Sequence, residues 1–292
     1  MCFIQKQNNY PTAIGDINIL FMNFSVLLSI YCNEEVHYFN RAMRSIWDEQ
    51  TIQPNEIVLV EDGPLTQELY QAIGIWKRQL KDLLKIVSIK KNSGVGNAKN
   101  IGVKACSNEL IAVMDTDDVS LPDRFEKQLT IFNSQDIDVC GAWVGEFVNN
   151  ENLIASYRRT PEKHNEIVIF AKSRSPVNHP TAMYKRSSVL KAGNYAKYRT
   201  SEDYDLFVKL IMSGAKLYNI QEPLVSMRIG NNQEARRRGL KNAIMEAGVQ
   251  KEFYIMGFLT VYELCRNITV GFFIRMLPSA LLKVVFRMIR KL

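Results

Sequence analysis

The chain has 292 residues, of which 47% are hydrophobic and 23% are charged, a balance typical of a folded protein with one substantial core. The apolar runs are all shorter than the roughly 18 residues that a membrane span needs, so the sequence indicates no transmembrane helix. The net charge is +7, but no acidic residue follows Glu263 and six Lys and Arg residues do. The positive surplus therefore belongs to the C-terminal segment and does not indicate a nucleic-acid-binding protein.

Cysteine usage and the N-terminal segment both favour a reducing compartment. The five cysteines have no C-x-x-C spacing, which argues against a disulfide framework and a structural zinc site and favours free thiols in the cytoplasm. Residues 1–22 have no continuous apolar region and no cleavage site, so we expect a loose extension there and not a secretory signal.

The first half of the chain alternates strand-like and helix-like segments. Short apolar runs predict strands over 24–31, 56–60, 84–89 and 109–114, and the segments between them predict helices over 36–47, 65–80 and 96–106. This alternation predicts an α/β fold with a mostly parallel sheet and helices on both of its faces. In such sheets the ligand crevice lies beyond the carboxyl ends of the strands.

The second half is less regular. We expect a strand over 138–148, a helix over 162–171, a loop over 176–180, a helix over 201–213, two short strands within 216–228 and a helix over 232–257. Ser201 is the expected N-cap of its helix, because Glu202 and Asp203 follow it in the first turn.

Polar and acidic residues follow each of the first four predicted strands. They include an acidic turn at 115–118, where Asp115, Asp117 and Asp118 come directly after the fourth strand. Three carboxylates in four residues repel one another, so a fold would not gather them without a countercharge. Carboxylates of this kind bridge Mg²⁺ or Mn²⁺ to substrate phosphates. The alternative is a solvated Asp-rich turn that caps the next helix.

Five segments, in order, resemble the motifs of glycosyltransferase family 2. They are 29–33, 57–63, 94–102, 115–124 and 201–206, and the resemblance extends over 24–228. It implies the GT-A fold, a Rossmann-like, mostly parallel sheet flanked by helices. The segment from His179 to Ala182 and the basic C-terminal tail are most similar to the amylovoran-type, surface-polysaccharide subgroup.

The resemblance implies a nucleotide-sugar pocket at the strand ends. Its residues would be Tyr31, Asn33, Glu35, Asp62, Lys99 and Asp117. Asp62 would accept a hydrogen bond from the donor base, as expected for uracil, and Lys99 would lie near the diphosphate. From the residues alone, the alternatives are that Asp62 is a turn former and that Lys99 is a solvated helix residue.

The resemblance also assigns the chemistry. Asp118 would be the main ligand of Mn²⁺ or Mg²⁺, assisted by Asp117 and Asp115, and the metal would neutralise charge on the departing diphosphate. Asp203 would be the general base that deprotonates the acceptor hydroxyl, so that one displacement inverts the anomeric configuration.

Glu202 and His179 would line the acceptor side or act as secondary residues. Glu202 and Asp203 would also suit any helix N-terminus, and His179 could be structural. Two positions depart from the family pattern: Glu61 stands where an Asp is usual, and Met227-Arg-Ile-Gly230 lacks the usual His.

These observations predict transfer of a single sugar, from a UDP-sugar to a glycan or lipid-linked acceptor in surface-polysaccharide biosynthesis. The expected organisation is an extension over 1–22, a catalytic domain over 23–230 with its nucleotide-binding half at 23–120 and its acceptor half at 121–230, and a helical region over 231–292. The alternatives are a sugar-phosphate nucleotidylyltransferase and a non-catalytic, membrane-associated scaffold.

The end of the chain predicts contact with a membrane. Lys283, Arg287, Arg290 and Lys291 share one face of a helix expected over 279–292, and apolar residues fill most of the rest. Such a helix can lie on an anionic bilayer. We therefore expect peripheral contact through 266–292, at the inner face of the cytoplasmic membrane. The alternative is a helix packed on the domain or on another subunit.

Overall fold

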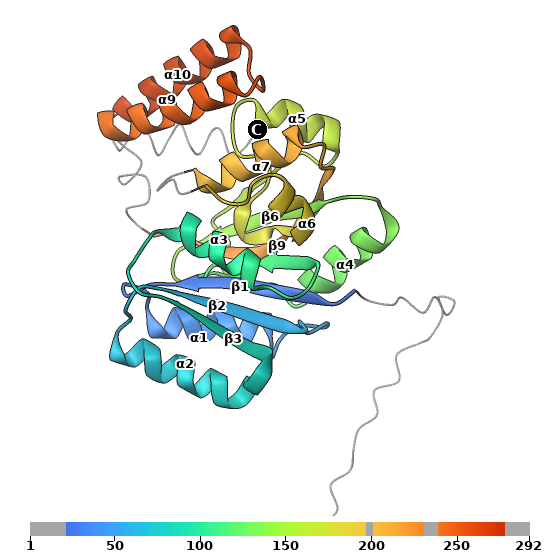
Figure 1. Ribbon diagram of the computed structural model, residues 1–292, viewed down its shortest axis with the longest axis vertical. Helices are drawn as coiled ribbons and strands as arrows, with labels where there is room; N and C mark the ends of the chain where they lie inside the picture. Colours follow the sequence, from blue (N-terminus) through green and yellow to red (C-terminus); the bar gives the residue numbers. More distant parts are fainter. Residues whose placement is uncertain (1–21, 197–200, 231–238, 278–292) are drawn as a thin grey trace, which may run out of the picture.

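A computed structural model describes residues 22–196, 201–230 and 239–277. Its strands join in one sheet, in the order β3-β2-β1-β4-β8-β6-β9-β5, with β7 paired to β6 beside that path. Helices cover the sheet on both sides, and a pair of helices lies at one end of the molecule (Figure 1).

The first half of the sheet is parallel, as the sequence predicts. It contains β1 (Phe24–Ile30), β2 (Glu56–Asp62), β3 (Leu84–Ile89) and β4 (Leu110–Val113), which pair in parallel. Helices α1 (Val36–Ile46) and α2 (Gln67–Leu80) pack on one face, and α3 (Val95–Ala105) packs on the other. Burial on both faces explains why these strands read as continuous apolar runs.

The second half of the sheet is mixed. Its strands are β5 (Val119–Ser120), β6 (Val139–Phe147), β7 (Ser156–Arg158), β8 (Met183–Lys185) and β9 (Leu217–Arg228). Strand β8 is antiparallel to β4 and β6, β5 is antiparallel to β9, β7 is antiparallel to β6, and β6 and β9 are parallel.

The expected pair of short strands within 216–228 is wrong, because β9 is one strand of 12 residues. Its register against β6 shifts around Trp143, which lies opposite Pro223. Proline cannot donate a ladder hydrogen bond and is tolerated at such a bulge. The proline therefore distorts the strand without ending it.

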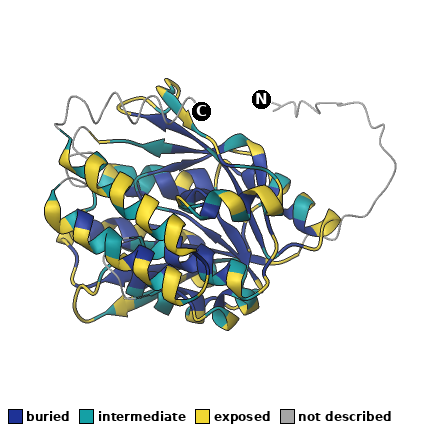
Figure 2. Cartoon of the chain, turned by 90° about the horizontal axis from the view of Figure 1, so that it is seen from above, coloured by how far each residue is buried: buried dark blue, intermediate teal, exposed yellow. Residues whose placement is uncertain are grey.

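The remaining helices are α4 (Arg124–Ser134), α5 (His164–Ala171), α6 (Arg186–Lys191), α7 (Glu202–Met212), α9 (Leu240–Ile255) and α10 (Val261–Met276), with short 3₁₀ turns η1 (Lys81–Leu83) and η2 (His179–Thr181). Buried residues concentrate on the strands and on the inner sides of the helices (Figure 2).

Helices α9 and α10 form a hairpin that attaches to the domain through a small apolar cluster, in which Tyr204 of α7 meets Phe253 and Phe258. The helix expected over 279–292 and the start of the one expected from 232 lie outside the described residues. Across the described ranges, no helix combines the length and hydropathy needed to cross a bilayer.

Candidate active site

The acidic turn leaves β4 directly and is tied to distant parts of the chain. Asp118 is 3% exposed, and its Oδ1 accepts a hydrogen bond of 2.8 Å from the main-chain N–H of Arg228 at the end of β9. Thr116 donates to Oε2 of Glu34 at 2.6 Å. The turn is therefore held between the end of β1 and the end of β9.

Two fully buried cations lie beneath the turn and supply the countercharge that the sequence argument required. Lys99 of α3 donates to the carbonyl of Met114 at 3.1 Å, and its Nζ lies 3.4 Å from Oδ1 of Asp115. Arg124 of α4 donates from Nη2 to the carbonyl of Val113 at 2.7 Å. Burial lowers the pKa of Arg124 to about 9. The alternative that Lys99 is a solvated helix residue is wrong, because its side chain is 0% exposed.

These cations reach only part of the acidic turn. Burial works against ionisation of Asp115, but Lys99 and His179 outweigh it and hold its pKa below the usual value. Burial, followed by the charges of Asp115 and Glu34, raises the pKa of Asp117 to about 7. Burial and its two Asp neighbours raise the pKa of Asp118 well above its usual range. An added cation near Asp117 and Asp118 would relieve this crowding.

The donor atoms suit a hard divalent cation. No group of three or more His, Cys, Asp or Glu side chains in the described ranges is arranged to hold a metal ion. Mg²⁺ and similar ions, however, commonly take one or two protein carboxylates together with substrate phosphates. Asp117 and Asp118 fit that smaller set, and Asp115 is already engaged by Lys99.

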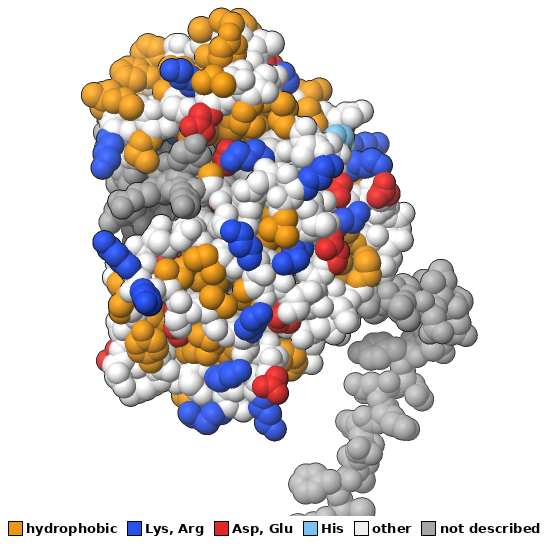
Figure 3. Space-filling view, in the orientation of Figure 1, with side chains coloured by type: hydrophobic (Ala, Val, Ile, Leu, Met, Phe, Trp, Pro, Cys, Tyr) orange, Lys and Arg blue, Asp and Glu red, His pale blue; other side chains and the backbone are white. Residues whose placement is uncertain are grey.

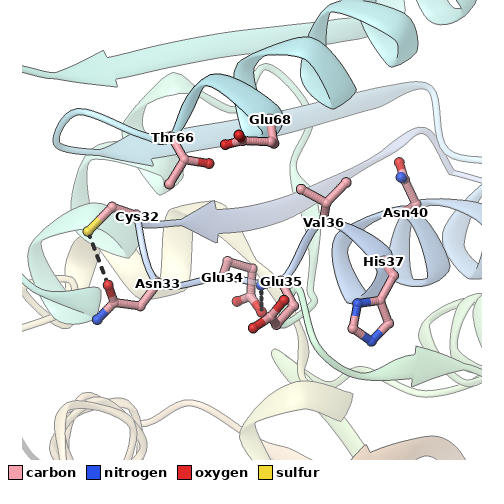
Figure 4. Close-up of a pocket in the computed structure, with 9 residues that line it drawn as sticks. All are labelled: Cys32, Asn33, Glu34, Glu35, Val36, His37, Asn40, Thr66 and Glu68. Carbon is pink, nitrogen blue, oxygen red and sulfur yellow. Dashed lines mark hydrogen bonds between the residues drawn. The ribbon is translucent and has the colours of Figure 1, made fainter.

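The loop after β1 borders a hollow of about 510 Å³ whose lining includes Asn33 and Glu35. In Figure 4 the side chains of Asn33 and Glu34 project away from Thr66 and Glu68, which line the other side. Glu34 projects toward its partner in the acidic turn, Thr116. Tyr31, which precedes the lining residue Cys32 in the sequence, is 41% exposed. The loop thus places three of the expected nucleotide-pocket residues at the edge of the sheet that carries the acidic turn.

Asp62 has a structural role that the sequence left open. Its Oδ1 accepts from the N–H and the hydroxyl of Ser93 at 2.7 and 3.0 Å, and its Oδ2 accepts from the N–H of Gly94 at 2.9 Å. The carboxylate therefore fixes the loop before α3 to the end of β2. Its neighbour Glu61, the departure noted above, accepts from Ser88 at 2.6 Å and braces β3 in the same way.

The charge of Asp115 in the acidic turn acts on the first turn of helix α7. Burial, then the charges of Asp203 and Asp115, raises the pKa of Glu202 to about 7. Ser201 occupies the N-cap position of this helix, as predicted, but its φ of 64° is left-handed and its side chain makes no cap hydrogen bond. A capping hydroxyl needs an extended backbone to reach the next amides.

The charges of Asp115 and Asp203 also act on His179. Burial lowers its pKa, while Asp115 and Asp203 act to raise it and Lys99 acts to lower it. Its Nε2 lies 2.9 Å from the hydroxyl of Tyr195, which in turn lies 3.2 Å from the hydroxyl of Tyr184. His179 is therefore both part of a buried hydrogen-bonded chain and a neighbour of the acidic residues.

Sequence reasoning missed several residues that build this site. Arg228 stacks its guanidinium 3.8 Å from the ring centre of Tyr38 and 4.5 Å from that of Phe147, and its Nε donates to the carbonyl of Asp117 at 3.2 Å. The sequence feature that could have drawn attention to Arg228 is its position in the segment 227–230, which lacks the His that is usual in the family. Arg124 lies inside the motif at 115–124 and Glu34 directly follows the motif at 29–33, but nothing in the sequence marked their burial or their partners.

The comparisons with known proteins agree on one family. A family model described as glycosyl transferase family 2 matches residues 26–192, more than half of the chain. An Escherichia coli protein named UDP-Gal:alpha-D-GlcNAc-diphosphoundecaprenol beta-1,3-galactosyltransferase is 33% identical over 258 residues, covering 88% of this chain and 92% of that protein. The amylovoran biosynthesis glycosyltransferase AmsE of Erwinia amylovora is 32% identical over 274 residues, covering 92% and 99%.

Solved structures share the fold. The mannosyltransferase PcManGT from Pyrobaculum calidifontis, in complex with GDP-Man and Mn²⁺, matches with a TM-score of 0.63 at 14% identity, over 90% of this chain and 73% of that one. S. aureus TarS 1–349 in complex with UDP-GlcNAc matches with a TM-score of 0.61 at 17% identity, over 87% and 72%. The expected GT-A architecture is confirmed.

Proposed function

The chain belongs to glycosyltransferase family 2 and transfers a sugar from a nucleotide sugar, and from that premise we propose a more specific reaction. The donor is a UDP-sugar, the acceptor is a lipid-linked glycan of surface-polysaccharide biosynthesis, and one sugar is transferred with inversion. The transfer takes place at the inner face of the cytoplasmic membrane and is catalysed by a domain that spans 23–230.

The names of similar proteins support this choice of substrates. The Escherichia coli relative is named for UDP-Gal and for a diphosphoundecaprenol acceptor, and the Erwinia relative is named for amylovoran biosynthesis. TarS has been solved with UDP and with UDP-GlcNAc. The mannosyltransferase with GDP-Man has the same fold, so UDP is favoured by the relatives and not by the fold.

A divalent metal ion fits Asp117 and Asp118, the carboxylates of the acidic turn whose pKa values are raised by burial and by neighbouring negative charge. Asp118 and Asp117 would hold it, and when bound it would supply Lewis-acid stabilisation of the departing diphosphate. Mn²⁺ accompanies the donor in the mannosyltransferase and in a GalNAc-T7 structure with UDP and GalNAc. Lys99 acts from below by keeping Asp115 ionised, and Asn33, Glu35 and Asp62 border the nucleotide.

Asp203 is the proposed general base. It takes the proton of the acceptor hydroxyl while that oxygen bonds to the anomeric carbon and the bond to the diphosphate oxygen breaks. Attack from the face opposite the leaving group inverts the configuration. The observation that supports this assignment is the packing of α7: the ring centre of Phe207 lies 6.5 Å from that of His179, and Leu206 and Phe207 belong to the same buried cluster as Val113 at the end of β4. The charges of Asp115 and Asp203 both act on the pKa values of Glu202 and His179, which agrees with a position of Asp203 beside the acidic turn.

The test is sugar transfer from a panel of radiolabelled nucleotide sugars to a diphosphoundecaprenol-linked acceptor, with and without Mn²⁺. We expect Asp118→Asn and Asp203→Asn each to lower kcat/KM by about a hundredfold or more. Asp136→Asn is the matched control, because Asp136 is 81% exposed and pairs only with surface lysines. Full activity of Asp203→Asn, or of the wild type in EDTA, would contradict the mechanism.

Thermal shift with UDP and Mn²⁺ separates the two roles. Stabilisation by the ligand should persist in Asp203→Asn and weaken in Asp118→Asn, since only the second residue is proposed to hold the metal. Release of pyrophosphate from UTP and a sugar phosphate would instead favour a nucleotidylyltransferase. Absence of transfer in the wild type, with ligand binding unchanged in both variants, would favour a scaffold.

A further inference from the structure

Helix α10 carries an exposed apolar face that has no partner within the described residues. None of its 16 residues is buried. Apart from Arg266 and Val270, its exposed residues recur at helical spacing and so share one side: Val261, Tyr262, Cys265, Thr269, Phe272, Phe273 and Met276. We call this set the hairpin face. Tyr262 is 75% exposed and Phe273 is 65% exposed, whereas exposed aromatic residues on a monomer are usually scattered singly.

The neighbouring helix extends the apolar surface. Leu240, Ile244 and Ile255 of α9 are 56%, 63% and 69% exposed. Figure 3 shows hydrophobic side chains gathered over the end of the molecule that holds α9 and α10. Such a concentration marks an interaction surface.

Charge around the hairpin favours an anionic partner. Two of its three acidic residues pair with cations of the protein: Glu246 with Arg275 at 2.6 Å, and Glu263 with Lys172 at 3.0 Å. The third, Glu252, is half-buried. Lys241, Lys251 and Arg266 are exposed on the two helices. No acidic residue follows Glu263 in the sequence, and four more Lys and Arg residues follow Met276.

We propose that the hairpin face lies in the interface of an anionic membrane, with its apolar side chains at the level of the lipid headgroups and acyl chains. A helical hairpin that exposes apolar side chains beside a cationic margin can bind such a surface. A second copy of the chain is less suitable, because it would bring two surfaces of the same positive charge together. The inference agrees with a lipid-linked acceptor, and to that extent it rests on the proposed function.

The proposal differs from contact through the basic tail alone. Residues 278–292 lie outside the described residues, and the hairpin face begins upstream of 266, at Val261. Membrane binding should therefore depend on side chains of α10 even when the tail is present. That dependence makes the two contributions separable.

The test is flotation of the full chain with vesicles of phosphatidylglycerol and phosphatidylcholine in equal parts, and with vesicles of phosphatidylcholine alone. The wild type should float with the first and much less with the second. Phe272→Glu/Phe273→Glu should lower partitioning about tenfold or more, since burial of one aromatic side chain is worth at least that factor. Ile75→Glu is the control, because Ile75 is 56% exposed on α2, at the opposite end of the molecule (Figure 1).

A second chain, ending at Leu277, isolates the tail. It should keep part of the vesicle binding and lose that part when Phe272 and Phe273 are also replaced. Wild-type flotation of the double variant would overturn the proposal, and so would a dimer in light scattering that the double variant dissociates. Sugar transfer to a water-soluble acceptor analogue, measured without vesicles, should be unchanged in the double variant. Absence of transfer in a wild type that floats would overturn the proposed function alone.

Discussion

Asp62 shows how a single carboxylate can shape a site without facing solvent. It is 4% exposed, and both of its oxygens accept hydrogen bonds from the loop at 93–94. That loop leads into α3, whose Lys99 lies under the acidic turn. The position of a buried cation therefore depends on a residue near the end of a different strand.

Replacing Asp62 by Asn should destabilise the protein by about 2 kcal/mol, because an amide NH₂ would face a backbone N–H and leave it unsatisfied. The measurement is urea unfolding at constant pH. Ser93→Ala keeps the backbone bond to Asp62 but removes the hydroxyl bond of 3.0 Å, together with the exposed bond that Asn97 donates to this hydroxyl at 2.9 Å, and should cost about 1 kcal/mol. Equal stability of Asp62→Asn and the wild type would show that the loop does not depend on this carboxylate.

At the scale of elements, the packing of α3 on the sheet depends on a glycine. A Cβ at Gly102 would lie 2.2 Å from Cδ1 of Leu27 and 3.1 Å from Cγ2 of Val60. Both side chains belong to the buried core between α3 and the sheet. The helix can therefore approach β1 and β2 only because this position has no side chain.

Gly102→Ala should lower the free energy of unfolding by about 1–3 kcal/mol, the usual cost of overpacking a core. Gly248 is the matched control, since it also lies inside a helix but has no atom within 4 Å of its would-be Cβ. Gly248→Ala should raise stability by about 0.5–1 kcal/mol. If both changes have the same sign, close packing of α3 is not the cause.

Helix α10 has a clear beginning that compensates for its lack of buried residues. Thr260 accepts from the N–H of Glu263 at 3.3 Å, and Glu263 accepts from the N–H of Thr260 at 2.8 Å. Glu263 also pairs with Lys172 of α5. The hydrogen bond from Thr260, followed by that from Lys172, holds the pKa of Glu263 below 4.5.

A lowered pKa in the folded state means that Glu263 stabilises α10 above the unfolded pKa and loses this effect as pH falls through the folded value. Amide exchange in α10 should therefore accelerate severalfold in the wild type between pH 6 and pH 3, after correction for intrinsic rates, as expected for loss of a cap worth about 1 kcal/mol. Glu263→Gln should exchange faster at pH 6 and show little further change. The same pH dependence in both proteins would contradict this account.

At the scale of the whole molecule, the sequence predicts the parallel half well because each of its strands is a continuous apolar run buried on both faces. The mixed half was harder to predict. Strand β5 is only two residues long and is defined by its pairing with β9. No local sequence pattern predicts such a pairing. The two short strands expected within 216–228 are one strand, whose register only shifts where Trp143 lies opposite Pro223.

The same distinction applies to the candidate site. The ends of the strands could be predicted because strand boundaries are local, so the positions of Asp62 at the end of β2 and Asp118 shortly after β4 were predicted. Arg124 and Arg228 were not, since their importance comes from burial and from partners far along the chain. The division into halves at 120 stays a prediction, and one sheet runs through both halves.

The hydrogen bond between Asp118 and Arg228 spans 110 residues of sequence, and this fixes when the site can be completed during synthesis. A ribosome releases the strands β1 to β4 long before it releases the end of β9, and domains fold as their segments emerge. A nascent chain halted before residue 228 would have the parallel strands and the acidic turn, but not the amide that anchors it. The enzyme therefore acquires its finished acidic turn only late in translation.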